Sequence, residues 1–305
     1  MNKIPSGIYP VMITPFTADN QVDYEAVDRI VEFYARSGCH GIFAVCQSSE
    51  MFCLTEDECE KLAARVVRAA AGRMAVVASG HTADRLCDQI GSLKRIAATG
   101  VDAVVMVSNR LASPEESDDA LIARMNTVLD AIPDVTFGMY ECPHPYKRML
   151  TSKVLAAMAQ SGRFTFIKDT CCSAPLIAER IKLLDGRVQM FNANCATALE
   201  SLEAGADGFS GIMANFHPDL LVWLYENYRA QPEKARRLSA LLSIMSLVEG
   251  CSHPAGAKYH MNKIGVPMEI ICRSINAAER FGYLERHAID DLLVMEEVVR
   301  EWLEA

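Results

Sequence analysis

A lysine and a tyrosine end two consecutive apolar segments, and together they could form and process an imine. Lys168 closes Phe164–Lys168, and Tyr140 closes Val135–Tyr140. With period-two alternation, Lys168 points the same way as Phe164 and Phe166. An amine among apolar neighbours loses solvation, which lowers its pKa and favours the neutral form that attacks a carbonyl. A phenol on the adjacent strand could transfer protons as a general acid or base.

Each of these two residues also has a simpler interpretation. Lys168 could end its strand and extend its ammonium group into water. Tyr140 could cap the apolar interior with its hydroxyl bonded to the backbone. Occurring together at the ends of neighbouring strands, the two residues favour the catalytic interpretation more than either does alone.

A third polar group follows the segment Gly41–Val45. The turn reads Cys46-Gln47-Ser48-Ser49-Glu50, and clustered hydroxyls and backbone N–H groups in a turn can hold a carboxylate. A plain polar loop has a similar composition, so the turn is a weak signal by itself.

Short apolar runs alternate with segments of helical period over the first two thirds of the chain. The predicted strands are Gly7–Thr14, Gly41–Val45, Met74–Ala78, Ala103–Val107, Val135–Tyr140, Phe164–Lys168, Val188–Asn192 and Gly208–Ile212. The predicted helices between them are Tyr24–Ser37, Glu56–Ala71, Ala83–Ala98, Ser117–Ala131, Ser152–Gln160, Pro175–Leu184 and Ala196–Ala204.

This alternation is typical of the α/β class and predicts a (β/α)8 TIM barrel, whose active site lies at the carboxyl ends of the strands. A doubly wound sheet is the alternative, and the lack of Gly-x-Gly-x-x-Gly after the first strand counts against a dinucleotide-binding version. Beyond Ile212 the sequence predicts only helices, which are His217–Tyr228, Pro232–Glu249, Gly256–Ile264 and Glu285–Glu304. We therefore expect a barrel over residues 1–214 and a C-terminal helical region over residues 215–305, packed on the barrel.

Composition excludes several classes of partner. The formal net charge of −9 disfavours nucleic acid and anionic membranes, which are bound through basic surfaces. The start MNKIPSGIYP has no apolar stretch of signal-peptide length, and no window approaches the roughly 20 apolar residues of a membrane span. A cytoplasmic protein is the expectation.

Eleven scattered cysteines include no Cys-x-x-Cys pair, so the sequence predicts neither a disulfide framework nor a zinc ribbon. Reduced thiols that fill the core are the favoured interpretation. A metal-dependent barrel enzyme is the rival, because Cys46, Cys142, Cys171 and Cys172 follow strands and thiols bind soft metals. We expect no metal and no cofactor.

The motifs resemble those of the dihydrodipicolinate synthase / N-acetylneuraminate lyase family over nearly the whole chain. The opening from Gly7-Ile8 to Thr14-Pro15-Phe16 is similar to the start of that family. Tyr140-x-x-Pro143, followed by Lys168 twenty-eight residues after the tyrosine, resembles its tyrosine and Schiff-base lysine motif. The segments Gly205–Gly208 through Ala214-Asn215, and Pro254-x-x-x-Lys258 with Met261 and Gly265, resemble its eighth strand and C-terminal helices.

The resemblance implies a class I lyase or aldolase without a cofactor. It implies that Lys168 forms an imine with pyruvate or another 2-oxo acid and that Tyr140 donates and accepts protons. It also implies that Ser48 and Ser49 bind the carboxylate of the substrate, with the main-chain carbonyl near Ser210 in the same pocket. Family members are usually homotetramers, and we expect a homo-oligomer, either a dimer or a tetramer.

Several departures indicate a divergent member rather than a true synthase or a sialic acid lyase. The family turn usually reads Gly-Thr-Thr-Gly-Glu, so Gln47 replaces the hydroxyl residue that hydrogen-bonds the tyrosine, and both glycines are lost, which restricts the backbone. Arg110-Leu111 stands where the synthases have a tyrosine pair, and Pro145 stands where they have an arginine. The positions that bind a sugar chain in the lyases are Cys195, Ala196 and Ile212.

The expected activity is aldol cleavage, aldol condensation or dehydration of a small 2-oxo acid, and the sequence does not choose among them. Arg110, Lys147 and Arg148 are candidate carboxylate ligands, although solvated loop charge is the favoured interpretation. The main rival from another class is a non-catalytic homologue that binds 2-oxo acids, supported by the altered turn at Gln47.

Overall fold

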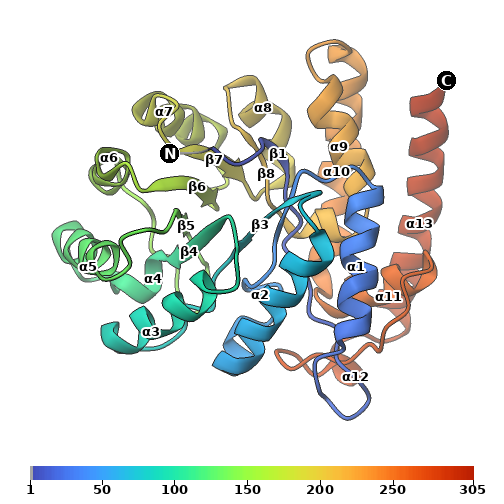
Figure 1. Cartoon of the computed structure of the whole chain (residues 1–305). Helices are drawn as coiled ribbons and strands as arrows, with labels where there is room; N and C mark the ends of the chain where they lie inside the picture. Colours follow the sequence, from blue (N-terminus) through green and yellow to red (C-terminus); the bar gives the residue numbers. More distant parts are fainter. Residues whose placement is uncertain (1–2) are drawn as a thin grey trace.

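The computed structural model describes residues 3–305, which form an eight-stranded barrel surrounded by helices (Figure 1). The strands are β1 (Gly7–Ile8), β2 (Gly41–Phe43), β3 (Ala75–Ala78), β4 (Ala103–Val107), β5 (Phe137–Tyr140), β6 (Phe164–Asp169), β7 (Gln189–Asn192) and β8 (Gly208–Phe209). All neighbouring strands are parallel, in the order β1-β8-β7-β6-β5-β4-β3-β2. The ring closes through backbone bonds from Phe43 N to Pro10 O at 2.9 Å and from Met12 N to Phe43 O at 3.0 Å. The prediction of a TIM barrel is confirmed.

Helices alternate with the strands and cover the outside of the barrel (Figure 1). They are α1 (Tyr24–Arg36), α2 (Glu56–Ala70), α3 (Leu86–Ala97), α4 (Ser108–Leu111), α5 (Asp118–Ala131), α6 (Ser152–Ser161), α7 (Ala174–Leu184) and α8 (Ala198–Glu203), with short 3-10 helices at Met51–Cys53, Cys195–Thr197 and Ile212–Asn215. The helix predicted from Glu56 begins with a capping box, in which Thr55 and Glu58 satisfy each other's backbone N–H groups. Helix α6 ends at Gly162, whose φ of 62° suits a residue without a Cβ.

Two strand predictions were too long by three residues or more, whereas Gly41–Val45 and Val135–Tyr140 each exceed the observed strand by two residues. The strand predicted over Gly7–Thr14 ends at Ile8, because Pro10 has no N–H to donate and the chain then meets β2 only at an isolated bridge between Val11 and Phe43. The strand predicted over Gly208–Ile212 ends at Phe209, and the chain soon turns into the 3-10 helix at Ile212–Asn215.

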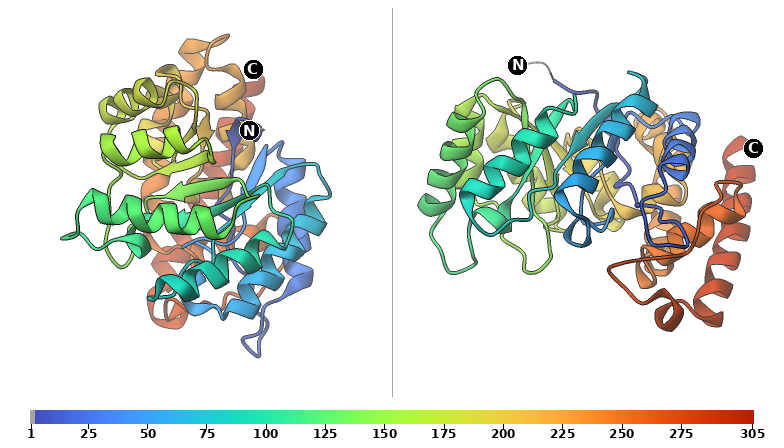
Figure 2. Two further views of the ribbon diagram at one scale, coloured as in Figure 1. Left: turned by 60° about the vertical axis from the view of Figure 1, so that its left-hand side comes forward. Right: turned by 60° about the horizontal axis from the view of Figure 1, so that its bottom comes forward.

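Beyond Asn215 the remaining elements of the described chain are helices. They are α9 (Pro218–Asn227), α10 (Pro232–Cys251), α11 (Ala255–Lys263), α12 (Ala277–Arg280) and α13 (Tyr283–Glu304). They lie together on one side of the barrel, next to α1 and far from α5 and α6, and Figure 2 shows the same grouping from two other directions. Within residues 3–305, no helix combines the length and the apolar character that crossing a membrane requires.

Packed aromatic rings fill the barrel interior beneath the carboxyl ends of the strands. Phe166 and Phe191 have ring centroids 4.8 Å apart, and Tyr9 lies 4.8 Å from Phe191. Phe43 packs edge-on against Phe166 at 5.7 Å. All four side chains are essentially inaccessible to solvent. These rings form an apolar floor on which the end residues of the strands rest.

Candidate active site

Lys168 ends on this aromatic floor with its amine unpaired. The residue is 4% exposed, and its Nζ atom lies 5.7 Å from the centroid of the Phe43 ring. Within residues 3–305, the contacts of this amine are with the aromatic rings of Phe43 and Tyr140, and it has no ion-pair partner. Burial lowers the pKa of Lys168 from its ordinary value of 10.5, although the Cys46 and Cys142 thiols, when ionised, would raise it.

Tyr140 lies directly beside this amine. Residues Tyr140 and Lys168 are register partners on β5 and β6, and Nζ is 4.3 Å from the centroid of the phenol ring. A desolvated contact with an aromatic face favours an ammonium ion by about 2 kcal/mol, whereas burial of an unpaired ion costs several kcal/mol. Desolvation therefore dominates and favours the neutral amine. Burial also raises the pKa of Tyr140 well above 10, so its phenol stays protonated.

The Tyr140 hydroxyl is held by the residue that replaces the usual hydroxyl residue of the turn. It donates a long hydrogen bond of 3.4 Å to Oε1 of Gln47, and the Cys142 thiol reaches the same oxygen at 3.4 Å. The substitution at Gln47 therefore changes the chemistry of the acceptor without removing it. An amide oxygen accepts a proton in a hydrogen bond but cannot donate one, so a relay onward from Tyr140 would end at this residue.

Lys168 and Tyr140 open onto a cavity of about 630 Å³ at the carboxyl ends of the strands. Of the other residues expected at the site, Gln47 and Ser48 line this cavity, whereas Ser49 and Ser210 are fully buried and lie outside its lining. Gly211, the residue after Ser210, lines the wall in its place.

Ser49 organises the turn instead of facing the cavity. Its hydroxyl donates to Cys46 O at 2.7 Å and accepts from Cys46 N at 2.6 Å, which closes the turn on itself. Cys46 and Ser49, which stand where the family usually has glycines, avoid the left-handed region, whereas Glu50 adopts it with φ of 61°.

Glu50 ties this turn to the C-terminal region. Its Oε1 atom accepts from the buried Nζ of Lys258 at 3.1 Å, and its Oε2 atom accepts from the backbone N–H groups of Arg273 and Ser274, both at 2.6 Å. The resemblance had singled out Lys258 without a reason for it. The structure gives that reason, since the ion pair fixes helix α11 against the mouth of the barrel.

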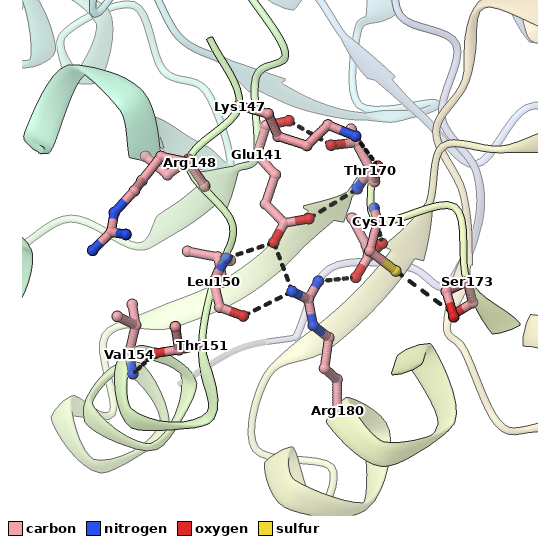
Figure 3. Close-up of polar contacts among 12 residues, drawn as sticks. Glu141, Lys147, Arg148, Leu150, Thr151, Val154, Thr170, Cys171, Ser173 and Arg180 are labelled. Carbon is pink, nitrogen blue, oxygen red and sulfur yellow. Dashed lines mark hydrogen bonds and ion pairs between the residues drawn. The ribbon is translucent and has the colours of Figure 1, made fainter. Parts of the chain in front are cut away.

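Sequence reasoning missed a charged cluster on the outer side of the same strand ends. Arg180, on α7, reaches Glu141 at 2.9 Å and also bonds Asp169, and all three side chains are at most 4% exposed (Figure 3). Glu141 further accepts from the N–H groups of Leu150 at 2.7 Å and Thr170 at 3.0 Å. Acidic residues directly after both Tyr140 and Lys168 were the available signal.

The basic residues of the neighbouring loops differ in what they contact. Arg110 pairs with Asp84 and Arg148 pairs with Asp118, and neither lines the cavity. Lys147 does line it, with Nζ donating to Thr170 O at 2.6 Å, and Figure 3 shows this side chain directed at Thr170. Within the described chain, no three His, Cys, Asp or Glu side chains gather as metal ligands would.

Comparisons with known proteins indicate the same family over most of the chain. The model of the Dihydrodipicolinate synthetase family matches residues 4–278. A 4-hydroxy-tetrahydrodipicolinate synthase of Marinobacter nauticus is 26% identical over 238 residues, which cover 78% of this chain and 80% of that protein. An uncharacterized DapA-like lyase of Halobacterium salinarum is 26% identical over 256 residues, which cover 83% of this chain and 82% of its own.

Solved structures share the fold at lower identity. The dihydrodipicolinate synthase of Acinetobacter baumannii, solved with pyruvate, superposes with a TM-score of 0.85 at 21% identity, covering 95% of this chain and 98% of its own. YagE, a prophage protein of the same family from E. coli K12, also solved with pyruvate, gives a TM-score of 0.85 at 20% identity and the same coverages. With the family match over residues 4–278, these results establish that the chain is a divergent member of the dihydrodipicolinate synthase family, whose enzymes are lyases.

Proposed function

We propose that this chain is a class I lyase or aldolase that forms a Schiff base between Lys168 and pyruvate or another small 2-oxo acid. The observation that carries the proposal is the unpaired, buried amine of Lys168 beside the phenol of Tyr140, at the wall of a 630 Å³ cavity. Two of the structural relatives were solved with pyruvate, which supports this choice of substrate.

In the proposed reaction, the neutral amine of Lys168 attacks the C2 carbonyl of the 2-oxo acid. The resulting carbinolamine takes up a proton from Tyr140 at its hydroxyl and loses water, which leaves an iminium ion. The Tyr140 phenolate then removes a C3 proton, which gives an enamine and restores the phenol. The enamine adds to an aldehyde in condensation, and cleavage follows the same steps in reverse.

The remaining lining residues would place the substrate. We assign Ser48 to the carboxylate, because it is the hydroxyl residue of the turn that lines the cavity. Ser49 holds the turn in shape, and Gln47 orients the Tyr140 hydroxyl. Gly211 contributes backbone to the same wall in place of Ser210.

Synthesis of a dihydrodipicolinate precursor is disfavoured by two positions. Arg110, which replaces a tyrosine of the synthases, pairs with Asp84 outside the cavity. Pro145, which replaces their substrate-binding arginine, has no charge to offer a second carboxylate. We therefore propose a different second substrate or leaving aldehyde.

The proposal is tested by reduction of the enzyme with borohydride in the presence of pyruvate. The expected result is a lactyl-sized adduct on Lys168, located by peptide mass spectrometry. Absence of the adduct across several 2-oxo acids would contradict the proposal.

The second candidate is a non-catalytic homologue that binds 2-oxo acids, and the altered acceptor at Gln47 is the observation that favours it. Exchange of the pyruvate methyl protons in D₂O, followed by NMR, separates the two candidates. An enzyme is expected to exchange these protons through the enamine, whereas a binding protein would be trapped by borohydride without accelerating exchange.

A further inference from the structure

The C-terminal region supplies part of the cavity wall. Its contribution consists of Gly250, His253, Pro254, Ser274 and Ile275. Only two of these five residues have polar side chains, and the Ser274 hydroxyl donates to Glu50 at 2.8 Å. His253 is thus the one member of this group with unused polar atoms.

The imidazole of His253 has buried nitrogens that satisfy no protein partner. Nδ1 and Nε2 are both shielded from solvent, and neither has a hydrogen-bond partner within residues 3–305. An unsatisfied buried donor or acceptor is unfavourable, and native proteins rarely keep one without a purpose. Oδ1 of Asn194, which also lines this cavity, is a second buried acceptor without a partner.

The surroundings keep this ring neutral. Burial lowers the pKa of His253 to about 3, and the charge of Lys258 adds to the effect. A neutral imidazole presents one donor and one acceptor, which matches an alcohol, since a hydroxyl group also donates once and accepts. A carboxylate would instead favour a charged imidazole or an arginine.

We propose that His253 determines specificity for the distal half of the substrate by hydrogen-bonding a hydroxyl group on the chain of a hydroxy-2-oxo acid. This inference rests on the proposed function, because Lys168 must hold the 2-oxo end for the distal end to reach the C-terminal wall. Asn194 is a second acceptor on the same cavity for that hydroxyl. One or two such groups suit a mono- or dihydroxy chain better than a sugar.

The test compares two probes of nearly equal size, 4-hydroxy-2-oxobutanoate and 2-oxopentanoate, which differ in a hydroxyl or a methyl at the same place. Each probe is added at increasing concentration in the presence of borohydride, and the amount of reduced adduct on Lys168 gives the half-saturating concentration. Where the enzyme cleaves the probe to pyruvate, the pyruvate adduct is counted as well. The wild-type protein is expected to half-saturate at an about tenfold lower concentration of the hydroxylated probe.

Two variants make the comparison specific. His253→Phe should bring the ratio of the two probes near one while pyruvate half-saturates within about twofold of wild type. His253→Gln, which keeps a neutral donor and acceptor, should retain a preference of about threefold or more. Pyruvate trapping reports that each variant is folded, and His253→Leu provides the apolar test in a smaller volume if the phenylalanine does not fit.

The contradictory outcomes are distinct. If wild-type protein forms no adduct with pyruvate, the proposed function fails and this inference fails with it. If pyruvate is trapped normally but His253→Phe keeps the wild-type ratio, the inference alone is wrong. If the protein prefers 2-oxoglutarate over both probes and this preference depends on His253, then His253 recognises a carboxylate and its assignment to a hydroxyl group is wrong.

Discussion

Lys168 and Asp169 are neighbours on β6, yet they lie in opposite electrostatic environments. Lys168 faces the cavity without an ion partner, and Asp169 faces outward, where it bonds Arg180. Tyr140 and Glu141 repeat this contrast on β5, since the tyrosine lines the cavity and Glu141 lies 2.9 Å from Arg180. Both sides are buried, so the difference lies in pairing alone.

The contrast shows how one strand end can hold a reactive group in place. On the outer side, charges are compensated by a buried arginine and backbone N–H groups, which fixes the backbone beside each cavity residue. On the inner side, the lack of compensation favours a neutral Lys168 amine, which is the form that the proposed Schiff-base reaction requires. In this proposal, the residues that face the cavity carry out the reaction, and the outer network around Arg180 holds the strand ends in position.

The largest expected effect on activity comes from removing the amine of Lys168, which faces the cavity. Lys168→Met keeps an apolar side chain of similar length but no nucleophile, so turnover should fall by at least about a thousandfold and the borohydride adduct should disappear. Lys147→Met is the matched control, because Lys147 lines the same cavity but donates to Thr170 O. An adduct that survives in Lys168→Met, or vanishes in Lys147→Met, would identify another lysine as the nucleophile.

Removing the inner phenol should separate imine formation from proton transfer. Tyr140→Phe keeps the ring over Lys168 and deletes the hydroxyl that contacts Gln47. Exchange of pyruvate methyl protons, measured by NMR, should slow by about 10²- to 10⁴-fold, while the adduct at Lys168 still forms at saturating pyruvate. Unchanged exchange would make Tyr140 a structural residue.

Removing Arg180, the arginine of the outer network, should lower the stability of the fold more than it changes the reaction. Arg180→Met leaves Glu141 and Asp169 buried without a counter-charge, and we expect a loss of about 3–5 kcal/mol in the free energy of unfolding. Urea denaturation measures this loss. Arg95→Met is the surface control, because Arg95 also contacts several acids but is 36% exposed, and its variant should lose much less stability than Arg180→Met. Equal losses in the two variants would remove the distinction between the two networks.

The sequence predicted the inner side of this comparison better than the outer side. Alternation along a strand is local, so Phe166 and Lys168 could be placed on one face from their spacing. Phe164 was expected on the same face, but the register of β5 and β6 shifts between Phe164 and Phe166, and the Phe164 ring packs against Phe137 instead. Arg180 comes from a helix whose rotation depends on packing, and helical period alone does not direct it to Glu141. The glutamate that ends the Gln47 turn matched the family pattern, but its contacts with Lys258 depend on how the C-terminal helices pack on the barrel.

The limits of the barrel were harder to predict for a similar reason. Apolar runs such as Gly7–Thr14 read as strands, but a ladder also needs N–H groups, and Pro10 lacks one. His253 gave no signal, because a lone histidine before a proline is ordinary and only the folded chain brings it to the cavity of Lys168. Long-range placement, not local propensity, accounts for these differences.

The pH dependence of amine reactivity gives a smaller but direct measure of the inner environment. Only the neutral amine reacts, so labelling by acetic anhydride should rise with pH through the pKa of each lysine. Because burial lowers the pKa of Lys168 from its ordinary value of 10.5, the midpoint of its labelling should come below pH 10.5. A midpoint at or above pH 10.5 would contradict a desolvated amine. The folded state then binds fewer protons at Lys168 than the unfolded chain does, so this residue's contribution to stability should increase as the pH rises through the folded pKa.

The smallest expected effect lies at Gln47, where the two interpretations of the altered turn differ most. Its Oε1 atom accepts from both Tyr140 and Cys142 at 3.4 Å, which are long contacts worth about 1 kcal/mol or less each. Gln47→Leu should therefore slow methyl-proton exchange only about fivefold, with pyruvate half-saturation unchanged, and Gln47→Thr should restore the rate by returning a hydroxyl. Cys142→Ala, which removes the competing donor, should leave exchange at the wild-type rate. If Gln47→Leu exchanges as fast as wild type, the tyrosine needs no acceptor at this position, and its placement comes entirely from the ring contacts with Lys168 and the strand-end network around Arg180.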